Sequence, residues 1–401
     1  MKKKIFKIFI IIIFLFSLSG CYNYKEINNY AIVSGVSIDK NNDDVNKYKI
    51  GVQIMNAKKN EEDNSTLITF YEASGKTIYD ALEKIILDSP KELYLGHNEV
   101  IVISEELLKK ENPLNYLDYF MRDPESAKDA VVITSKEKKA SSILKVITPL
   151  ETIPSKNLKA TLSVADNFSG ILTVITIDEF ISDLSNSKTE AIIPSVKIEG
   201  KVKKGEMMDN IQNSDPKTKL TFDTLGYFKD SKLKGYLTTN ESVGYNFLAN
   251  FPKETYINVK CDKNNYATLR INSNKFKEKF YYEGKTPVVN VNIKVNADLL
   301  EYNCKTDFLK NKNEVKKLEN KAKKRVNKLM NQTISKLYKE EKTDTLKYGE
   351  KFYTKKYKET KNLKYNIKDI IEKAKFKFNT KVSVKSTELT IKSVRKENSD
   401  E

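Results

Sequence analysis

The first 21 residues constrain this chain more than any other segment, because they decide on which side of a membrane the rest of it folds. Four lysines within the first seven residues precede an apolar run from residue 8 to residue 18. This run is about half as long as the ~20 residues that a spanning helix needs, so it indicates a cleaved signal peptide over residues 1–20. We therefore expect the remaining chain to fold outside the cytoplasm.

The apolar run ends in Leu18-Ser19-Gly20-Cys21, the small-residue pattern of a bacterial lipobox. In such a segment the cysteine thiol takes a diacylglyceryl thioether, and the new amino terminus is N-acylated after cleavage. Each buried methylene contributes about 0.8 kcal/mol, so two or three acyl chains hold a water-soluble body firmly on a bilayer. The sequence thus predicts a lipid membrane anchor at Cys21, and an ordinary signal peptide with a chance cysteine is the alternative.

The composition of the chain after Cys21 indicates what kind of body the anchor would hold. No later segment is apolar for the ~20 residues of a membrane span, so we expect one aqueous ectodomain with room for two or three cores. The formal net charge of +17 falls to +13 once the four signal lysines are removed. Because the lysines are spread along the sequence and not gathered in one stripe, we expect a solvated surface and no nucleic-acid partner.

Two cysteines remain besides the lipid cysteine. Cys261 and Cys304 do not belong to a Cys-x-x-Cys pair, so no zinc site is predicted. In an exported protein they are candidates for one disulfide or for two small buried thiols. Sequence spacing cannot bring two α-carbons within bonding reach, so both interpretations stay open.

The first half of the mature chain alternates strands with helices. A capping box of Thr176 and Glu179 marks the start of its last helix, near residue 177. We expect an N-terminal domain of α/β type over residues 21–200. Its predicted strands are 31–38, 48–54, 67–71, 100–103, 130–134 and 194–198, and its earlier helices are 78–86, 107–121 with a break at Pro113, and 140–147.

Residues 201–217 are polar and have no apolar period, so we expect a linker there. A C-terminal α+β domain is expected over residues 218–395, with two subdomains divided near residues 300–312 as an alternative. It opens with a hairpin that turns at Asp230 and Ser231 and contains extended runs at 257–261, 267–271, 289–295 and 376–384. Residues 396–401 are expected to form a disordered tail.

The clearest single element is a long amphipathic helix over residues 313–341. Val315, Leu318, Ala322, Val326 and Leu329 form an apolar stripe against a lysine-rich back, over a length of about 40 Å. Such a stripe is typical of core packing, and partner binding is the alternative. The fold class predicted from these patterns is α+β, a multi-domain ectodomain of mixed sheets packed by helices.

The catalytic repertoire of the chain is narrow, because His97 is its only histidine. Any Ser-His-Asp or Cys-His nucleophile would depend on this residue, and a metal site would have one imidazole at most. No phosphate-binding glycine motif is present. We therefore predict no catalytic, cofactor-binding or metal site, and we interpret Gly96 and His97 as a structural or interaction turn before the strand at residue 100.

Several segments, in this order, resemble the Ger(x)C family, the lipoprotein C subunits of spore germinant receptors in relatives of Bacillus and Clostridium. The family tends to have a Trp-Asp pair after the lipid cysteine, where this chain has tyrosine and asparagine. The similar segments are 21–27, Ala31 to Asp39 (Ala-Ile-Val-Ser-Gly-Val-Ser-Ile-Asp), Gly75-Lys76-Thr77, 93–100 with its Gly-His turn, Arg122-Asp123, 228–237, 241–245 and Asp344 to Gly349.

The resemblance implies a subunit without enzymatic activity that is built from α+β modules. It implies an anchor on the outer face of the spore inner membrane, and action with a spanning A subunit and a permease-like B subunit in sensing small nutrients. It does not tell whether this subunit binds the small molecule directly. A solute-binding lipoprotein of an importer and, with less support, an anchored hydrolase are the alternatives.

Overall fold

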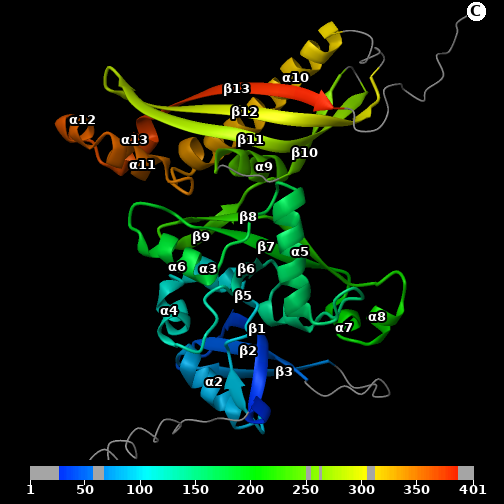
Figure 1. Cartoon of the computed structure of the whole chain (residues 1–401). Coiled ribbons are helices and arrows are strands. Elements are labelled where there is room, and N and C mark those ends of the chain that lie inside the picture. The colour runs from blue at the N-terminus through cyan, green and yellow to red at the C-terminus, as the bar shows by residue number, and fades with distance from the viewer. Residues whose placement is uncertain (1–26, 57–66, 250–253, 262–263, 305–311, 387–401) are drawn as a thin grey trace, which may run out of the picture.

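The computed structural model describes residues 27–56, 67–249, 254–261, 264–304 and 312–386, and it forms two sheets that lie one above the other (Figure 1). Both sheets are mixed and both are packed by helices, so the predicted α+β class is confirmed. The signal peptide, Cys21, and the tail over residues 396–401 lie outside the described residues.

Within the described residues, the larger sheet has nine strands in the order β3-β2-β1-β5-β6-β7-β8-β9, with β4 paired to β1. The strands β1, β5, β6 and β7 run parallel, whereas β2, β3, β8 and β9 join antiparallel at the two sides. Parallel strands are apolar on both faces because helices cover both faces. The bounds are β1 Tyr30–Lys40, β2 Tyr48–Met55, β3 Ile68–Gly75, β4 Glu92–Tyr94, β5 Val100–Ser104, β6 Val131–Ser135, β7 Ile192–Glu199, β8 Lys219–Lys229 and β9 Lys232–Tyr236.

Helices pack on both faces of this sheet. One face carries α2 (Ile78–Ile86), α3 (Glu105–Lys110), α4 (Leu114–Arg122) and α6 (Ile177–Ser185), with the predicted break at Pro113 and the predicted capping box both present. The other face carries α5 (Pro154–Phe168), which the sequence pattern did not predict because few of its residues are apolar.

The segment predicted as a helix over residues 140–147 is instead a short 3-10 helix, Ala140–Lys145. Its first amides are held by Asp39 at the end of β1, whose carboxylate accepts hydrogen bonds from the N–H of Ala140 (2.6 Å) and Ser141 (3.1 Å). Burial raises the pKa of Asp39 and these two donors oppose that rise. This tertiary contact explains why the local pattern misjudged the type of helix.

Residues 201–217 do not separate the two sheets as a linker would. The strands on either side of them, β7 and β8, pair antiparallel, with Glu199 opposite Lys219. The stretch contains the helical turns α7 (Val202–Gly205) and α8 (Asp209–Gln212). The amide of the buried Asn210 donates to the carbonyls of Ile147 (2.9 Å) and Thr218 (3.0 Å), so a polar side chain anchors the stretch.

The second sheet has the order β10-β11-β12-β13, and α9 and α10 pack against it. Since β12 and β13 pair in parallel, residues 300–312 do not divide two subdomains. The predicted long helix is present as α10 and a following π-helical turn, Ser335–Glu340, and its apolar stripe is buried in the core. The bounds are α9 Thr239–Leu248, β10 Thr255–Lys260, β11 Tyr266–Glu283, β12 Thr286–Tyr302, α10 Lys312–Ile334, α11 Tyr348–Lys355, α12 Tyr357–Asn362, α13 Ile367–Lys373 and β13 Lys375–Ser386.

Candidate functional site

The turn at Gly96 and His97 links β4 to β5. Its backbone is closed by a hydrogen bond from the Asn98 N–H to the Leu95 carbonyl, 3.1 Å long. A β-carbon on Gly96 would lie 2.4 Å from the Tyr94 hydroxyl oxygen, so a larger residue here would push the Tyr94 ring aside. Glycine therefore leaves this ring in its place beside the turn.

His97 lies on the surface of this turn and makes an aromatic contact. Its side chain is exposed and meets the ring of Tyr94 edge-on, with centroids 5.7 Å apart. Tyr94 in turn contacts Tyr30 at the start of β1, with centroids 5.3 Å apart. The three rings form a continuous surface cluster, which we call the aromatic turn (Tyr30, Tyr94 and His97). Such a cluster can dock against another surface, since exposed rings combine apolar area with polar edges.

Within residues 27–386, apart from the gaps given above, no group of three or more His, Cys, Asp or Glu side chains is arranged to hold a metal ion. Glu99, two residues after His97, is paired with Lys159 at 2.7 Å. The turn thus carries the exposed His97 and, two residues later, a carboxylate that is already paired.

A second cluster lies where the two sheets meet, around the segment from Asp344 to Gly349. The buried Asp344 carboxylate accepts hydrogen bonds from the Tyr338 hydroxyl (2.5 Å) and from the N–H groups of Gly349 and Glu350 (3.0 Å each). Burial raises the pKa of Asp344, and these donors oppose the rise. Asp344 thereby fixes the start of α11 and the path of the chain before it.

This segment reaches across to the first sheet, and we call the set of contacts the inter-sheet joint. Lys347, in the left-handed region at φ 60°, pairs with Asp183 of α6. The Asn186 amide donates to Glu350 at 3.1 Å. The joint is completed by the hydrogen bonds from Tyr227 to Glu341 (2.9 Å), from Lys229 to the Glu341 carbonyl (2.7 Å) and from Tyr245 to the Thr345 carbonyl (3.3 Å).

The joint explains a motif that the sequence alone left without a role. The segment from Asp344 to Gly349 was part of the family resemblance, but nothing in it announced a partner in α6. Asp183 and Asn186 are separated from it by more than 160 residues and follow no pattern that would mark them. A sequence-based search could have found one end of the joint, and only the tertiary structure supplies the other.

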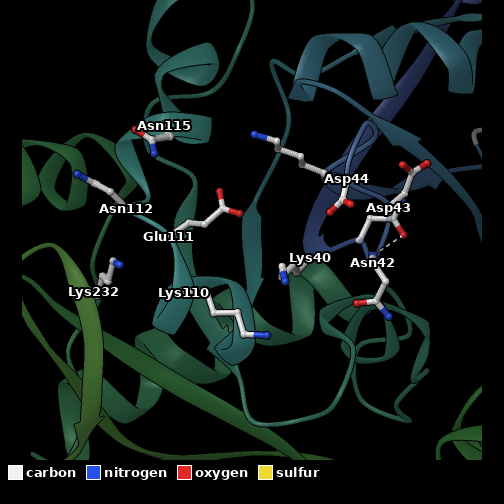
Figure 2. Close-up of a pocket in the computed structure, with 11 residues that line it drawn as sticks. Lys40, Asn42, Asp43, Asp44, Lys110, Glu111, Asn112, Asn115 and Lys232 are labelled. Carbon is white, nitrogen blue, oxygen red and sulfur yellow. Dashed lines mark hydrogen bonds between the residues drawn. The ribbon is translucent and has the colours of Figure 1, made fainter.

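A polar cavity of about 540 Å³ opens between the turn after β1 and the link between α3 and α4 (Figure 2). Two of its three carboxylates, those of Asp43 and Glu111, already have local partners. Asp43 accepts from the N–H of Val45 (2.8 Å), and Glu111 accepts from the Tyr48 hydroxyl (3.0 Å). Burial and this glutamate raise the pKa of Tyr48 to about 12. These contacts brace the turn.

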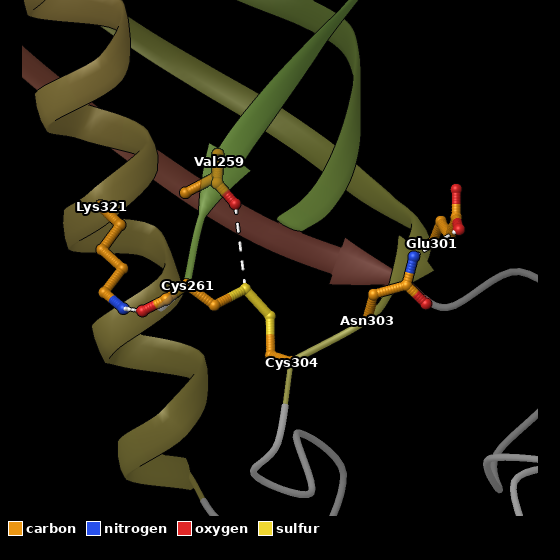
Figure 3. Close-up of a disulfide and its surroundings, with 6 residues drawn as sticks. All are labelled: Val259, Cys261, Glu301, Asn303, Cys304 and Lys321. Atoms are coloured by element: carbon orange, nitrogen blue, oxygen red, sulfur yellow. Dashed lines mark hydrogen bonds between the residues drawn. A yellow bond between two sulfur atoms is a disulfide. The ribbon is translucent and has the colours of Figure 1, made fainter. Parts of the chain in front are cut away.

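Cys261 and Cys304 lie together at the edge of the second sheet (Figure 3). Cys261 follows β10, Cys304 follows β12, and their sulfur atoms are joined, with α-carbons 5.8 Å apart. That separation lies within the range of protein disulfides. The Lys321 ammonium of α10 donates to the Cys261 carbonyl, so the bridge, the sheet and the helix meet at one point. Of the two interpretations left open by the sequence, this geometry favours the disulfide.

None of the helices in the described part of the chain has the length and apolar character needed to cross a membrane. The second sheet also does not repeat the first, because it has four strands in the order β10-β11-β12-β13 with one parallel pair, β12 and β13, whereas four strands run parallel in the first. The two similar lobes that a solute-binding lipoprotein would need are thus not found in the described chain.

Comparison with known proteins assigns the class. A family model described as Spore germination protein N-terminal domain matches residues 23–198, and one described as Spore germination B3/GerAC like, C-terminal, matches residues 223–388. These models define a two-part spore germination protein. The chain belongs to the Ger(x)C family, and the resemblance noted in its sequence is confirmed.

Individual relatives agree with this assignment. Spore germination protein KC of Bacillus subtilis (strain 168) is 29% identical over 349 residues, which is 84% of each chain. Spore germination protein B3 of the same strain is 24% identical over 335 residues, covering 82% of this chain and 84% of that protein. The crystal structure of the GerBC protein shares the fold, with a TM-score of 0.54 at 19% identity over 90% of this chain and 99% of that one.

Proposed function

We propose that this chain is the lipid-anchored C subunit of a spore germinant receptor and that it acts in nutrient-triggered germination by contact with spanning A and B subunits. The observation that carries the proposal is the match of both halves of the chain to spore germination proteins. The lipobox supports an anchor at Cys21 on the outer face of the spore inner membrane. In this proposal the protein is not an enzyme and needs no cofactor.

The anchor suggests which surface meets the spanning subunits. Tyr30 follows Cys21 by nine residues, and an extended chain covers at most about 3.6 Å per residue, so the start of β1 lies within about 32 Å of the lipid. The aromatic turn lies beside the start of β1 and is therefore close to the membrane. We propose it as the contact surface for the A and B subunits.

The two family models also suggest how the chain is divided into modules. The two family models end and begin on either side of residues 201–217. We propose that residues 21–200 and 218–395 are inherited as modules, although the sheet of the first continues through β8 and β9 of the second. Because β8 and β9 belong to the second module but complete the first sheet, deleting the second module would also remove two strands of the first sheet.

Anchoring is tested by a strain in which Cys21→Ala replaces the wild-type gene. We expect the spore membrane fraction to lose the protein and the spores to lose their response to particular germinants, with vegetative growth unchanged. The control is Lys91→Ala, which changes an exposed side chain and keeps the anchor cysteine. Normal germination of the Cys21→Ala spores would contradict the proposal.

The contact surface is tested separately with His97→Ala. Because His97 is exposed, we expect normal amounts of folded protein in the membrane but a weakened germinant response. Lys91→Ala, another exposed residue in the loop before β4, is the control and should leave the response unchanged. Equal responses of the two strains would remove the aromatic turn from the proposed interface while leaving the anchor proposal intact.

A further inference from the structure

The positive charge of the mature chain is confined to its second half. Residues 241–401 contain 38 Lys and Arg against 21 Asp and Glu, whereas residues 21–240 contain 29 against 33. Lysines occur along the whole sequence, but acidic residues balance them only in the first part. A charge asymmetry of this size between halves points to an anionic partner for the basic half.

Many of these lysines gather on one face of the second sheet. Along its strands, exposed lysines alternate with buried residues such as Phe280 and Ile293, which face α10 and the core. The exposed side is thus the side turned away from α10. We call it the lysine face, and it comprises Lys275, Lys277 and Lys279 of β11, Lys294 of β12, and Lys375, Lys377 and Lys381 of β13.

The register of the strands aligns these lysines in rows. Lys275 lies directly opposite Lys294, and Lys294 lies opposite Lys381, so three ammonium groups sit side by side on three neighbouring strands. Within the described chain, Lys377 alone among the seven has a carboxylate partner, Glu283. Like charges directly opposite one another in a sheet lower its stability. An anion that bridges the three ammonium groups would relieve this repulsion, so the row is suited to binding one.

The space between the lysines is polar. Asn379 donates to the side-chain oxygens of Asn290 (3.1 Å) and Asn292 (3.0 Å), so an amide ladder holds the middle of the face. Tyr281 lies only at the hairpin edge of the face. Protein interfaces are poor in lysine and depend on aromatic anchors, and single-stranded nucleic acids are held by stacked rings. Neither kind of partner fits this surface well.

We infer that the lysine face binds a linear polyanion that carries a phosphate or carboxylate on each repeat. Neighbouring strands are about 4.8 Å apart and alternate residues about 6.8 Å apart, so the face offers an array of positive charges with which a flexible polyanion can make several contacts at once. The second sheet lies at the end of the molecule opposite β2 and β3 (Figure 1). An anchor that holds the opposite end of the molecule at the bilayer would keep this sheet at a distance from it, which favours a polymer over a lipid surface.

The test uses the mature chain in a non-ionic detergent, with linear polyphosphate and poly-L-glutamate as probes. We expect binding whose log Kd changes linearly with log salt concentration. The triple variant K275Q/K294Q/K381Q should bind at least about tenfold more weakly at low salt, and its salt slope should fall by about 2, as expected for three lost charge contacts at about 0.7 each. At low salt this triple variant should be at least as stable as the wild type, because the repulsion between the three facing lysines has been removed.

The matched control is K316Q/K323Q/K324Q, which removes the same charge from the exposed side of α10, where these three lysines have no carboxylate partner among the described residues. It should weaken binding less than about threefold, since it changes only the long-range attraction. Equal losses in the two triple variants would overturn the inference, because binding would then follow net charge alone. The inference would also be overturned if neither polymer bound. This holds even if phosphatidylglycerol vesicles bind and the triple variant K275Q/K294Q/K381Q weakens that binding. This experiment is independent of the proposed function in germination.

Discussion

Replacing Gly244 by alanine sets helix propensity against packing. In isolation the change should stabilise α9, because alanine is favoured over glycine in a helix interior by about 1 kcal/mol. In the folded chain, a β-carbon at this position would lie 2.2 Å from the carbonyl oxygen of Leu329 and 2.3 Å from the hydroxyl of Thr333, both on α10. The two helices therefore cross at a point where glycine alone fits.

The size of the effect can be estimated from these distances. An ordinary contact begins near 3.4 Å, so α9 and α10 would have to separate by about 1 Å. A gap of this size forfeits up to half of the dispersion energy along the seam, and overpacking of this kind costs about 1–3 kcal/mol. Opening the seam also weakens the hydrogen bond from Thr333 to the Glu241 carbonyl, 2.7 Å long, which contributes about 1 kcal/mol. After the gain of about 1 kcal/mol in helix propensity is subtracted, we expect a net loss of stability of about 1–3 kcal/mol.

The assay is urea unfolding of Gly244→Ala beside the wild type, followed by circular dichroism. Val164→Ala is the control for propensity, since Val164 is 58% exposed in α5 and its replacement should stabilise by only a few tenths of a kcal/mol. If Gly244→Ala were as stable as the wild type, or more stable, the close crossing of α9 and α10 would be refuted.

Three further predictions concern cross-links within the structure. Because the loop closed by Cys261 and Cys304 spans 43 residues, their joint replacement by serine should destabilise by about 2–4 kcal/mol in urea and remove all sensitivity to a thiol reductant, and no loss would show that the thiols are free. A double-mutant cycle on Asp183 and Lys347 should yield a coupling of about 0.5 kcal/mol, because the side chains are 24% and 41% exposed, and a coupling near zero would remove the pair from the joint. Hydrogen bonding to a lysine lowers the pKa of Glu341 below 4.5, so its ionised form stabilises the fold above that pH and the contribution is lost as the pH falls. Glu341→Gln should thus be less stable than the wild type near neutral pH, and this gap should close in acid.

Local sequence patterns were sufficient to predict those elements whose apolar period or capping residues are complete within the element itself. The strands β1, β2 and β5 have continuous or alternating apolar residues, and α6 has a complete capping box, so these were predicted close to their observed limits. The stripe of α10 likewise indicated the face that is buried. In contrast, α5 buries little more than Leu158 and Leu162 among its large apolar residues, and its sequence carries too weak a period to be recognised.

Some of the candidate sites could be found from the sequence, and others only from the tertiary structure. The glycine of the aromatic turn could be singled out because it and His97 stand in a short polar segment before an apolar strand. The inter-sheet joint could not, because its contacts run between α6 and the segment after α10 and have no spacing rule. The alternation of Lys275, Lys277 and Lys279 was visible in the sequence, but the row with Lys294 and Lys381 depends on strand register.

By itself the sequence predicted an export signal and a lipid cysteine, and it determined the α+β class and the single histidine, because each of these depends on residue type and short-range order. Tertiary structure alone decided that residues 201–217 connect two paired strands of one sheet, that Cys261 meets Cys304, and that the lysines of three strands lie on one face. The reason is physical: strand pairing joins residues at any separation along the chain, and its register is set by the burial of a whole face.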